Sequence, residues 1–302
     1  SLGRQLIIAS LKSPDDLIEV MGSIGSYAAA LKTTLGDQKL DQAFKALMLG
    51  LPTEADIAAA LGANVDTDKV LAARDFVRGQ LGDRLRDTLL GIWNDTGESG
   101  AYEPSPASTG RRALRYAVLG LLAAGTPDTT VKLIQRELAN ASNMTAEIGA
   151  LTAMLSIDAP EREQELEKFY ARHKGDHLLV DKWFALNAYV AKAAKIEALM
   201  GHPDFRLSTP NRVYALIGGF TSMNLAGFHA ADGEGYRVVA ATILKLDKTN
   251  PQVAARLATG FRSWRLMDEP RRKAATGQLE RIVATPGLSR DCFEIASKTL
   301  KG

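Results

Sequence analysis

The sequence has a single cysteine, Cys292, few aromatic residues and almost no net charge. One thiol supports neither a disulfide framework nor a thiolate metal site, which excludes both of these ways of stabilising a fold. Lys and Arg number 37 against 35 Asp and Glu, whereas a nucleic-acid surface normally leaves a marked basic excess. The longest apolar run, residues 116–125, has about half of the ~20 residues that a membrane-spanning helix needs. We therefore expect neither a nucleic-acid nor a membrane partner, and we predict a cytoplasmic protein.

Hydrophobic residues make up 46% of the 302 residues, which is enough to bury a sizeable core in one large domain or two ordinary ones. The first residues, Ser1-Leu2-Gly3-Arg4, do not resemble a signal peptide. We expect the chain to be a part of a longer protein.

Apolar residues recur with helical spacing along the whole sequence. One face of a helix is predicted at i, i+3, i+4, i+7 and i+8 by Leu114, Ala117, Val118, Leu121 and Leu122. A second face is predicted by Val253, Leu257, Phe261 and Trp264. The alternation typical of a half-buried strand never persists, and alanine is abundant. These patterns predict an all-α fold.

Helix starts are marked by a capping residue followed by proline. This signal occurs at Ser13-Pro14, Thr126-Pro127, Thr209-Pro210 and Asn250-Pro251, while Thr53 and Ser289 are further capping residues. Helices of about 10–14 residues with short connections give roughly sixteen to eighteen antiparallel helices. Stacked helix pairs without a fixed repeat indicate an irregular, solenoid-like superhelix.

Turn-forming residues fill one long segment, Asn94 to Gly110. The apolar pattern is alike on both of its sides. We therefore predict one domain over residues 1–302, with a long surface loop at about 94–110.

An ordered series of motifs carries a family resemblance. The series comprises Pro210-Asn-Arg212, Leu216-Ile-Gly218, Phe228-His-Ala230, Asp232-Gly-Glu-Gly-Tyr236 and Asn250-Pro-Gln-Val-Ala-Ala-Arg256. In order and spacing it resembles the C-terminal helical domain of the bacterial aminopeptidase N family, the zinc alanyl aminopeptidases. Further matches at Leu51–Glu54, Gly110–Arg115, Ala141–Thr145 through Ala150-Leu151, and Val180–Phe184 extend the likeness from about Ala43 to the end.

The resemblance implies a parent enzyme that removes N-terminal residues from peptides with one zinc ion. Family members hold this zinc with a His-Glu-x-x-His motif and a further Glu, and two imidazoles at i and i+4 suit that purpose. The sequence contains no such motif, because the one histidine pair at that spacing, His173 and His177, is interrupted by Gly175-Asp176. We interpret this pair as solvated or capping histidines and predict no metal or cofactor in this chain.

The other candidate catalytic and cofactor-binding residues give only weak sequence signals. Ser222, His229 and Asp232 could form a nucleophile set, but no nucleophile elbow surrounds Ser222, and a loop histidine holding backbone carbonyls is the favoured interpretation of His229. Gly233-Glu-Gly235 lacks the third glycine and the preceding strand of a dinucleotide loop.

Two further features are interpreted as structural. Cys292 is expected in the core beside apolar neighbours. The basic run over residues 262–273 is interrupted by Asp268 and Glu269 and is expected to be a solvated face. We therefore predict no catalytic residues in this chain.

The resemblance implies substrate-channel residues instead. The family's helical domain closes over the catalytic domain, and a glutamine and an arginine of its Asn-Pro-Gln-Val-Ala-x-Arg helix face the peptide beyond the scissile bond. These positions are Gln252 and Arg256, whose i, i+4 spacing places them on one helix face. Arg212 matches the family's Pro-Asn-Arg arginine, and Tyr214 stands where the bacterial enzymes often have another arginine.

We hypothesise an accessory domain that caps the active-site cavity and gates peptide entry. Its expected partners are the catalytic domain of the same parent chain, which holds the zinc, and short peptides. The alternative from another class is a free-standing helical scaffold that binds a protein or peptide in its groove.

Overall fold

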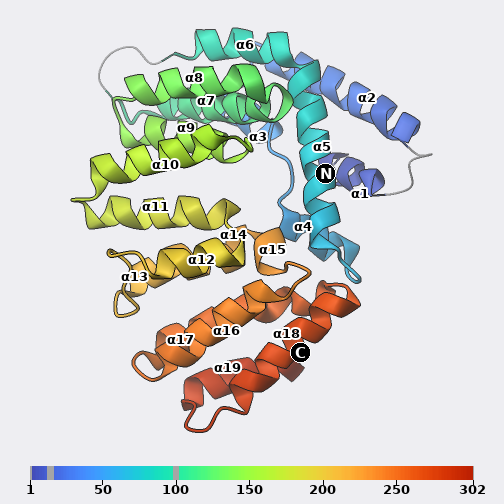
Figure 1. Cartoon of the computed structure of the whole chain (residues 1–302). Coiled ribbons are helices and arrows are strands. Elements are labelled where there is room, and N and C mark those ends of the chain that lie inside the picture. Colours follow the sequence, from blue (N-terminus) through green and yellow to red (C-terminus); the bar gives the residue numbers. More distant parts are fainter. Residues whose placement is uncertain (1, 12–16, 98–101, 302) are drawn as a thin grey trace. The chain divides into compact units, whose positions relative to one another are not determined.

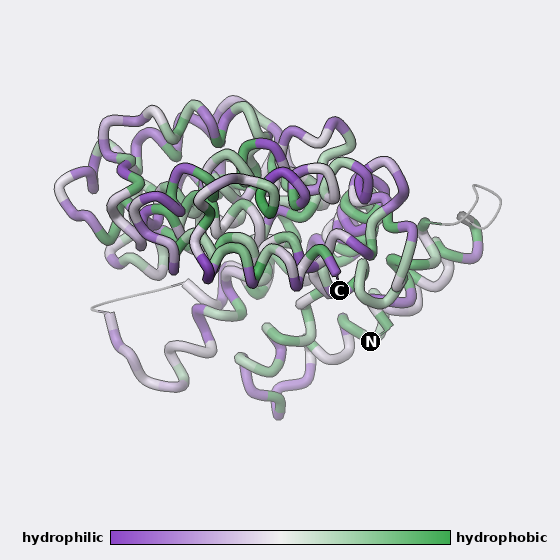
Figure 2. The backbone as a smooth tube through the Cα atoms, turned by 90° about the horizontal axis from the view of Figure 1, so that it is seen from below, coloured by the Kyte–Doolittle hydropathy of each residue, from purple (hydrophilic) through white to green (hydrophobic). Residues whose placement is uncertain are grey.

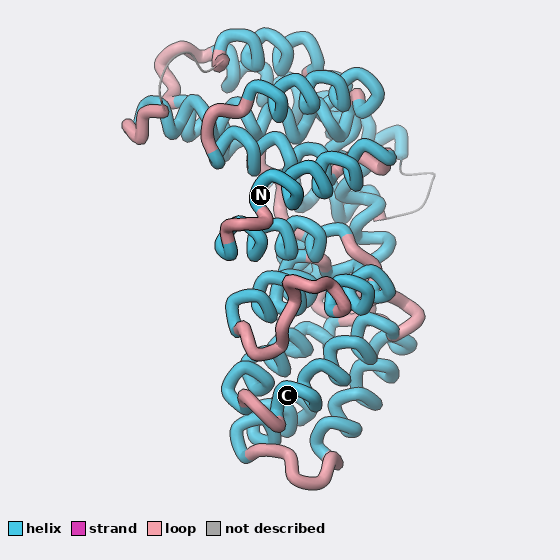
Figure 3. The backbone as a smooth tube through the Cα atoms, turned by 60° about the vertical axis from the view of Figure 1, so that its left-hand side comes forward, coloured by secondary structure: helices cyan, strands magenta, loops and turns pink. Residues whose placement is uncertain are grey.

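The computed structural model describes residues 2–11, 17–97 and 102–301, and most of these residues are helical (Figures 1 and 3). Within those ranges there is no strand, and the single isolated β-bridge joins Val65 to Met267. None of the described helices is both long enough and apolar enough to cross a membrane. The prediction of an all-α fold is confirmed.

The chain contacts divide into two compact units. The first comprises residues 1–53 and 70–167, and the second comprises residues 54–69 and 168–302. Two helices span the division in sequence: α5 (Thr67–Arg84) and α10 (Pro160–His173). The single domain over residues 1–302 stays a prediction.

The described part of the first unit contains seven further helices. They are α1 (Leu2–Ser10), α2 (Leu17–Gly36), α3 (Gln42–Met48), α6 (Arg86–Asp95), α7 (Pro106–Gly125), α8 (Pro127–Asn140) and α9 (Met144–Leu155).

The second unit contains the remaining helices, among them the π-helix η2 and the 3₁₀-helix η3. They are α4 (Glu54–Leu61), α11 (His177–Val190), α12 (Ala193–Met200), α13 (Pro210–Val213), η2 (Tyr214–Gly218), α14 (Gly219–Met223), α15 (Leu225–Phe228), α16 (Glu234–Asp247), α17 (Pro251–Ala258), η3 (Thr259–Leu266), α18 (Glu269–Val283) and α19 (Arg290–Lys301). Helices α13, η2 and α14 follow one another without a break, and so do α17 and η3. When each continuous run is counted as one helix, the number of helices in the described residues agrees with the roughly sixteen to eighteen predicted.

Helix α7 is the centre of the first unit, where α3, α6, α8 and α9 pack against it. The predicted apolar face is largely confirmed, because Leu114, Val118, Leu121 and Leu122 are buried. Hydrophobic and hydrophilic residues alternate within single helices along the chain, as amphipathic packing requires (Figure 2). Arg115 adds a polar tie, because it pairs with Glu137 of α8 at 2.7 Å.

Two glycines let α5 and α7 approach backbone to backbone. A Cβ on Gly82 would lie 2.1 Å from the carbonyl oxygen of Leu121, and a Cβ on Gly125 would lie 2.3 Å from the backbone nitrogen of Asp83. Neither neighbour is a side chain that can rotate away. Only glycine therefore permits this helix crossing.

The core of the second unit is formed around α16, which packs against α12, α15, α17 and α18. Its aromatic centre is Phe228, whose ring meets Tyr236 and Phe261 edge-on at centroid distances of 5.2 Å. The second predicted apolar face is confirmed, because Val253, Leu257, Phe261 and Trp264 are buried. Edge-to-face packing of this kind favours one arrangement of the rings.

The helix-start signals mostly lie where the structure begins a helix. Helices α8, α13 and α17 begin at Pro127, Pro210 and Pro251, and the Asn250 side chain accepts from the backbone N–H of Val253 at 3.2 Å. The signal at Ser13-Pro14 lies outside the described residues.

The predicted loop at about 94–110 is too long. Helix α6 continues to Asp95 and α7 already begins at Pro106, after the N-cap Ser105. Ser105-Pro106 is itself a capping residue followed by proline, because the Ser105 hydroxyl accepts from the Ser108 backbone at 3.3 Å. The turn-rich composition concealed this start signal.

We expect Gly82→Ala to lower the free energy of unfolding by at least the ~1–3 kcal/mol typical of overpacked cores, because the added methyl meets backbone atoms. Gly91→Ala in α6 is the matched control, since nothing lies within 4 Å of its Cβ position. The control should stabilise by about 0.5–1 kcal/mol through helix propensity. Urea unfolding of both variants checks this, and equal stabilities would contradict the close crossing.

Candidate functional site

The second unit contains a partly open cavity of about 570 Å³. Its walls come from α4, α11, η2, α14, α15, α17 and η3, so segments far apart in the sequence meet there. Small residues dominate the lining, with Ala58, Ala185, Gly218, Gly219 and Gly260 among them. Because these side chains are small, backbone and hydroxyl groups of the lining are accessible to a ligand in the cavity.

The π-helix η2 and the 3₁₀-helix η3 both line this cavity. Tyr214, Ala215 and Gly218 come from η2, while Thr259 and Ser263 come from η3. Runs of 3₁₀-helix longer than three or four residues are uncommon, and π-helical turns occur frequently at functional sites. The irregular helices of this unit therefore mark the cavity as the best candidate for a binding site.

The charge of the cavity is entirely positive over the residues that the structure describes. Its charged lining residues are Arg256 and Arg262, and no Asp, Glu, Lys or His lies among the described lining residues. The Arg256 guanidinium lies over the Tyr214 ring, 4.7 Å from its centroid. This stacking holds a fixed cation at the cavity while its donors stay exposed.

A buried polar network supports the η3 wall. His229 is fully buried, with Nδ1 hydrogen-bonded to the Tyr236 hydroxyl at 2.6 Å and Nε2 to the Ser263 hydroxyl at 2.9 Å. Burial, aided by the nearby Arg271 cation, lowers the pKa of His229 from 6.5 to about 3, while burial raises the pKa of Tyr236. The imidazole is therefore neutral, and its bond to Ser263 fixes a residue of the cavity wall.

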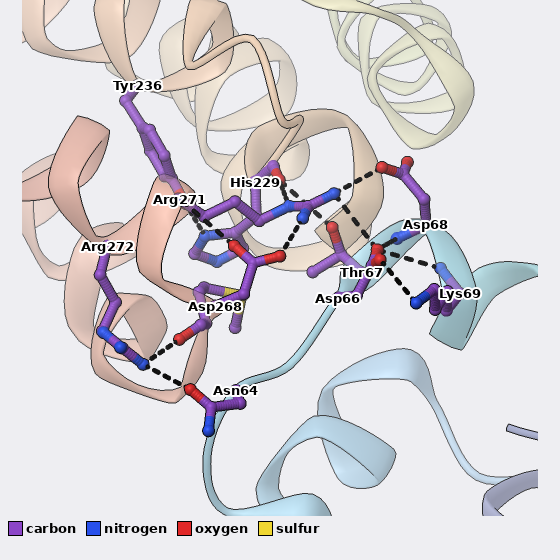
Figure 4. A network of polar contacts seen from close by, with 11 residues as sticks. Asn64, Asp66, Thr67, Asp68, Lys69, His229, Tyr236, Asp268, Arg271 and Arg272 are labelled. Atoms are coloured by element: carbon purple, nitrogen blue, oxygen red, sulfur yellow. Dashed lines mark hydrogen bonds and ion pairs between the residues drawn. The ribbon is translucent and has the colours of Figure 1, made fainter. Parts of the chain in front are cut away.

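Arg271 is the cation of this network (Figure 4). Its guanidinium pairs with Asp68 and Asp268, lies 3.3 Å from Asp66, and donates from Nε to the His229 carbonyl oxygen at 2.7 Å. Only 4% of its side chain is exposed. The buried charge is thus satisfied by carboxylates from residues far apart in the sequence.

Two backbone hydrogen bonds join Val65 to the residues at the end of η3. The Val65 N–H donates to the Leu266 carbonyl at 2.9 Å, and the Asp268 N–H donates to the Val65 carbonyl at 3.0 Å. Leu266 ends η3 and lines the cavity. Residues 64–69 therefore fix the end of the η3 wall.

The structure brings together two of the four predicted channel residues. Tyr214 and Arg256 both line the cavity, whereas Gln252 is exposed on α17 and does not line it. Arg212 is buried, with its guanidinium donating to Asp181 and to the carbonyls of Asp204 and His177. It lies two residues before Tyr214 and holds α13 against α11.

The other candidate groups are placed apart. The Ser222 hydroxyl donates to the Gly218 carbonyl at 2.7 Å and Asp232 accepts from the Glu234 backbone, while the His229 ring nitrogens are bonded to Tyr236 and Ser263. The prediction that His229 holds backbone carbonyls is wrong, because both ring nitrogens are hydrogen-bonded to hydroxyl groups instead.

The histidine pair is placed as the sequence predicts. Helix α10 ends at His173, and Asp176 caps α11, which begins at His177. Cys292 is buried as expected, and burial raises the pKa of its thiol to about 12.

The basic run over residues 262–273 is not a uniformly solvated face. Arg271 is buried in the network, and Arg265 stacks on Trp264 while donating to the Leu300 carbonyl at 2.7 Å. Arg262 of the same run lines the cavity, which the sequence reasoning missed. Its spacing of six residues from Arg256 fits a shared face only when the helix tightens to three residues per turn.

The residues that the structure describes offer no donor set that fits a zinc ion. Among the residues that the structure describes, no group of three or more His, Cys, Asp or Glu side chains could hold a metal. Zinc is bound by such N, S and O ligands, usually four in number.

Comparison with known families places this fold. The family described as "Domain of unknown function (DUF3458_C) ARM repeats" matches residues 2–301. ARM repeats stack helices into superhelices, which is the architecture that the sequence predicts.

Three curated proteins of similar sequence are named aminopeptidase N. The chain is 37% identical to aminopeptidase N of Caulobacter vibrioides over 304 residues, covering 99% of this chain and 34% of that protein. It is 32% identical to aminopeptidase N of Escherichia coli over 276 residues, covering 90% of this chain and 32% of that protein. The chain thus spans about a third of the length of these curated relatives.

A solved structure shares the fold. The crystal structure of Legionella pneumophila aminopeptidase A in complex with aspartic acid matches with a TM-score of 0.82 and 26% identity, covering 98% of this chain and 38% of that chain. The helical arrangement of this chain therefore recurs within a longer aminopeptidase.

We expect His229 to make stability depend on pH. The unfolded chain binds a proton near pH 6.5, whereas the folded imidazole stays neutral down to about pH 3 because burial lowers its pKa. Stability should therefore fall, by up to about 1.4 kcal/mol per pH unit, as the pH drops below 6.5. In urea unfolding, His229→Gln should be less stable than the natural chain at neutral pH.

The difference between the two proteins isolates this histidine, because every other titrating group is common to both. The difference in the free energy of unfolding between the natural chain and His229→Gln should become smaller as the pH falls from 7.5 to 5. A gap that stays constant over this range would contradict the neutral, buried assignment.

Proposed function

We propose a function that starts from the family of this chain. The chain belongs to the ARM-repeat family that it matches and is a C-terminal helical domain of the aminopeptidase N type. On this premise, the chain is the accessory domain of a zinc-dependent aminopeptidase that removes N-terminal residues from peptides. The zinc and the catalytic groups belong to another domain of the same longer protein. Relatives about three times as long support this view over a free-standing scaffold.

The domain caps the active-site cavity and contacts the peptide after the scissile bond. The observation that supports this role is the Arg256 guanidinium stacked on Tyr214 at a cavity without acidic residues among its described lining. A guanidinium offers a planar set of donors to peptide carbonyls and carboxylates. Stacking on the ring limits its motion, so less rotamer entropy is lost when a peptide binds.

The other channel residues support Arg256. Gln252 lies one turn earlier on α17 and offers an amide beyond the cavity, to a longer peptide. Arg212 acts through Tyr214, because its bonds to Asp181, Asp204 and His177 hold the start of the helical run that carries the tyrosine. Capping restricts entry to short, unfolded peptides by size.

The contribution of these residues is binding and orientation. Arg256 meets parts of the peptide whose charge does not change during bond cleavage, so it binds the ground state and the transition state equally. The groups that hold or move a proton in the reaction are proposed to belong to the catalytic domain. The cytoplasmic location stays a prediction.

In the complete enzyme, Arg256→Ala should raise KM for short peptides about fivefold to tenfold, with kcat little changed, because it removes uniform binding. Steady-state kinetics on tripeptides measures both constants. Arg281→Ala is the matched control, since Arg281 is an exposed helical arginine outside the cavity. A large fall in kcat at constant KM would refute the binding role.

A further inference from the structure

The cavity contains a second cation that the proposed function does not use. Resting on that function, we infer that Arg262 is a specificity residue that binds a carboxylate in the part of the peptide after the scissile bond. The aminopeptidase would then favour peptides that carry negative charge downstream of the cleaved residue.

The helix geometry places Arg262 beside Arg256. In a continuous α-helix, residues six apart lie on different faces, about 120° from each other. The run changes from α17 to the 3₁₀-helix η3 at Thr259, and in a 3₁₀-helix residues three apart are eclipsed. Thr259 and Arg262 therefore follow Arg256 along one face, and all three line the cavity.

The charge balance points to an anionic ligand. Arg262 is exposed, and no described residue forms an ion pair or a side-chain hydrogen bond with it. Arg265, one 3₁₀ turn later, stacks on Trp264 and donates to the Leu300 carbonyl, and Arg271 is paired with carboxylates. The cavity thus combines two guanidinium groups with no acid among its described lining residues to neutralise them.

The wall that carries Arg262 is held in place. Ser263, the next residue, is hydrogen-bonded to the buried His229, and the carbonyl of Leu266 at the end of η3 accepts from the Val65 N–H. Gly260 allows close packing on α14, because its Cβ position lies 2.8 Å from the Thr221 Cβ. A cation on a fixed wall loses less entropy when it binds.

The matching ligand group is a carboxylate. A peptide offers it either as a Glu or Asp side chain or as its C-terminal group, and both accept hydrogen bonds from guanidinium. Two cations in one cavity suit a peptide with both kinds of carboxylate near each other. The experiment must therefore separate the two sources.

The test measures kcat/KM of the complete enzyme on matched peptide pairs. One set has Glu or Gln at each of the three positions after the cleaved bond, with the C-terminus amidated. Another set has a free or an amidated C-terminus and no acidic side chain. We expect the acidic member of at least one pair to be favoured about fivefold, the size of an ion pair at a partly exposed site.

Substitutions assign this preference to Arg262. Arg262→Gln should abolish the preference for the acidic peptide, Arg262→Lys should retain part of it, and Arg262→Glu should reverse it toward Lys-containing peptides. Arg265→Gln is the matched control on the same helix and should leave the ratio unchanged, because Arg265 is occupied elsewhere. Added salt should reduce the natural preference.

The outcomes separate this inference from the proposed function. If Arg256→Ala raises KM for all peptides but Arg262→Gln changes no acidic-to-neutral ratio, the carboxylate role of Arg262 is wrong and the accessory function stands. If Arg256→Ala also has no effect, the proposed peptide contact itself fails. Unchanged thermal unfolding of the variants excludes a folding defect as the cause.

Discussion

The cavity depends on one buried cation and its carboxylates. Arg271 lies among Asp66, Asp68 and Asp268 with only 4% of its side chain exposed. Removing a charge from water is costly, and the cost is offset only when every donor finds an acceptor. Because these acceptors come from the segment around the start of α5 and from the start of α18, the pairing holds both segments at the end of η3.

The network matters because a 3₁₀-helix needs outside support. Its hydrogen bonds have poorer geometry than those of an α-helix, so long 3₁₀ runs seldom persist by themselves. Here the Ser263 hydroxyl is bonded to His229, and the bridge between Val65 and Met267 fixes the last turn. The tight winding that aligns the cavity arginines is thus a tertiary effect.

Local signals predicted much of the fold and little of this site. The caps at Thr126-Pro127 and Asn250-Pro251 and the apolar face around Val118 depend on neighbours within two turns, so the sequence reveals them. Burial of Arg271 depends on Asp68, 203 residues away, and no local pattern distinguishes it from a solvated arginine. The motif resemblance pointed to Arg256, but the change in helix type that brings Arg262 beside it leaves no periodic signal.

The arginines of the described residues include buried ones with acidic partners and exposed ones at the cavity. Arg115, Arg212 and Arg271 are buried with acidic partners, so their charge serves the fold. Arg256 and Arg262 are exposed to solvent, so their charges carry no large desolvation cost while the cavity is free. In the proposed function, a peptide would displace solvent from both guanidinium groups, so each contact would contribute modestly and alike before and during bond cleavage. In the proposed function, such contacts would select which peptides stay bound, and the catalytic groups would come from another domain of the longer protein.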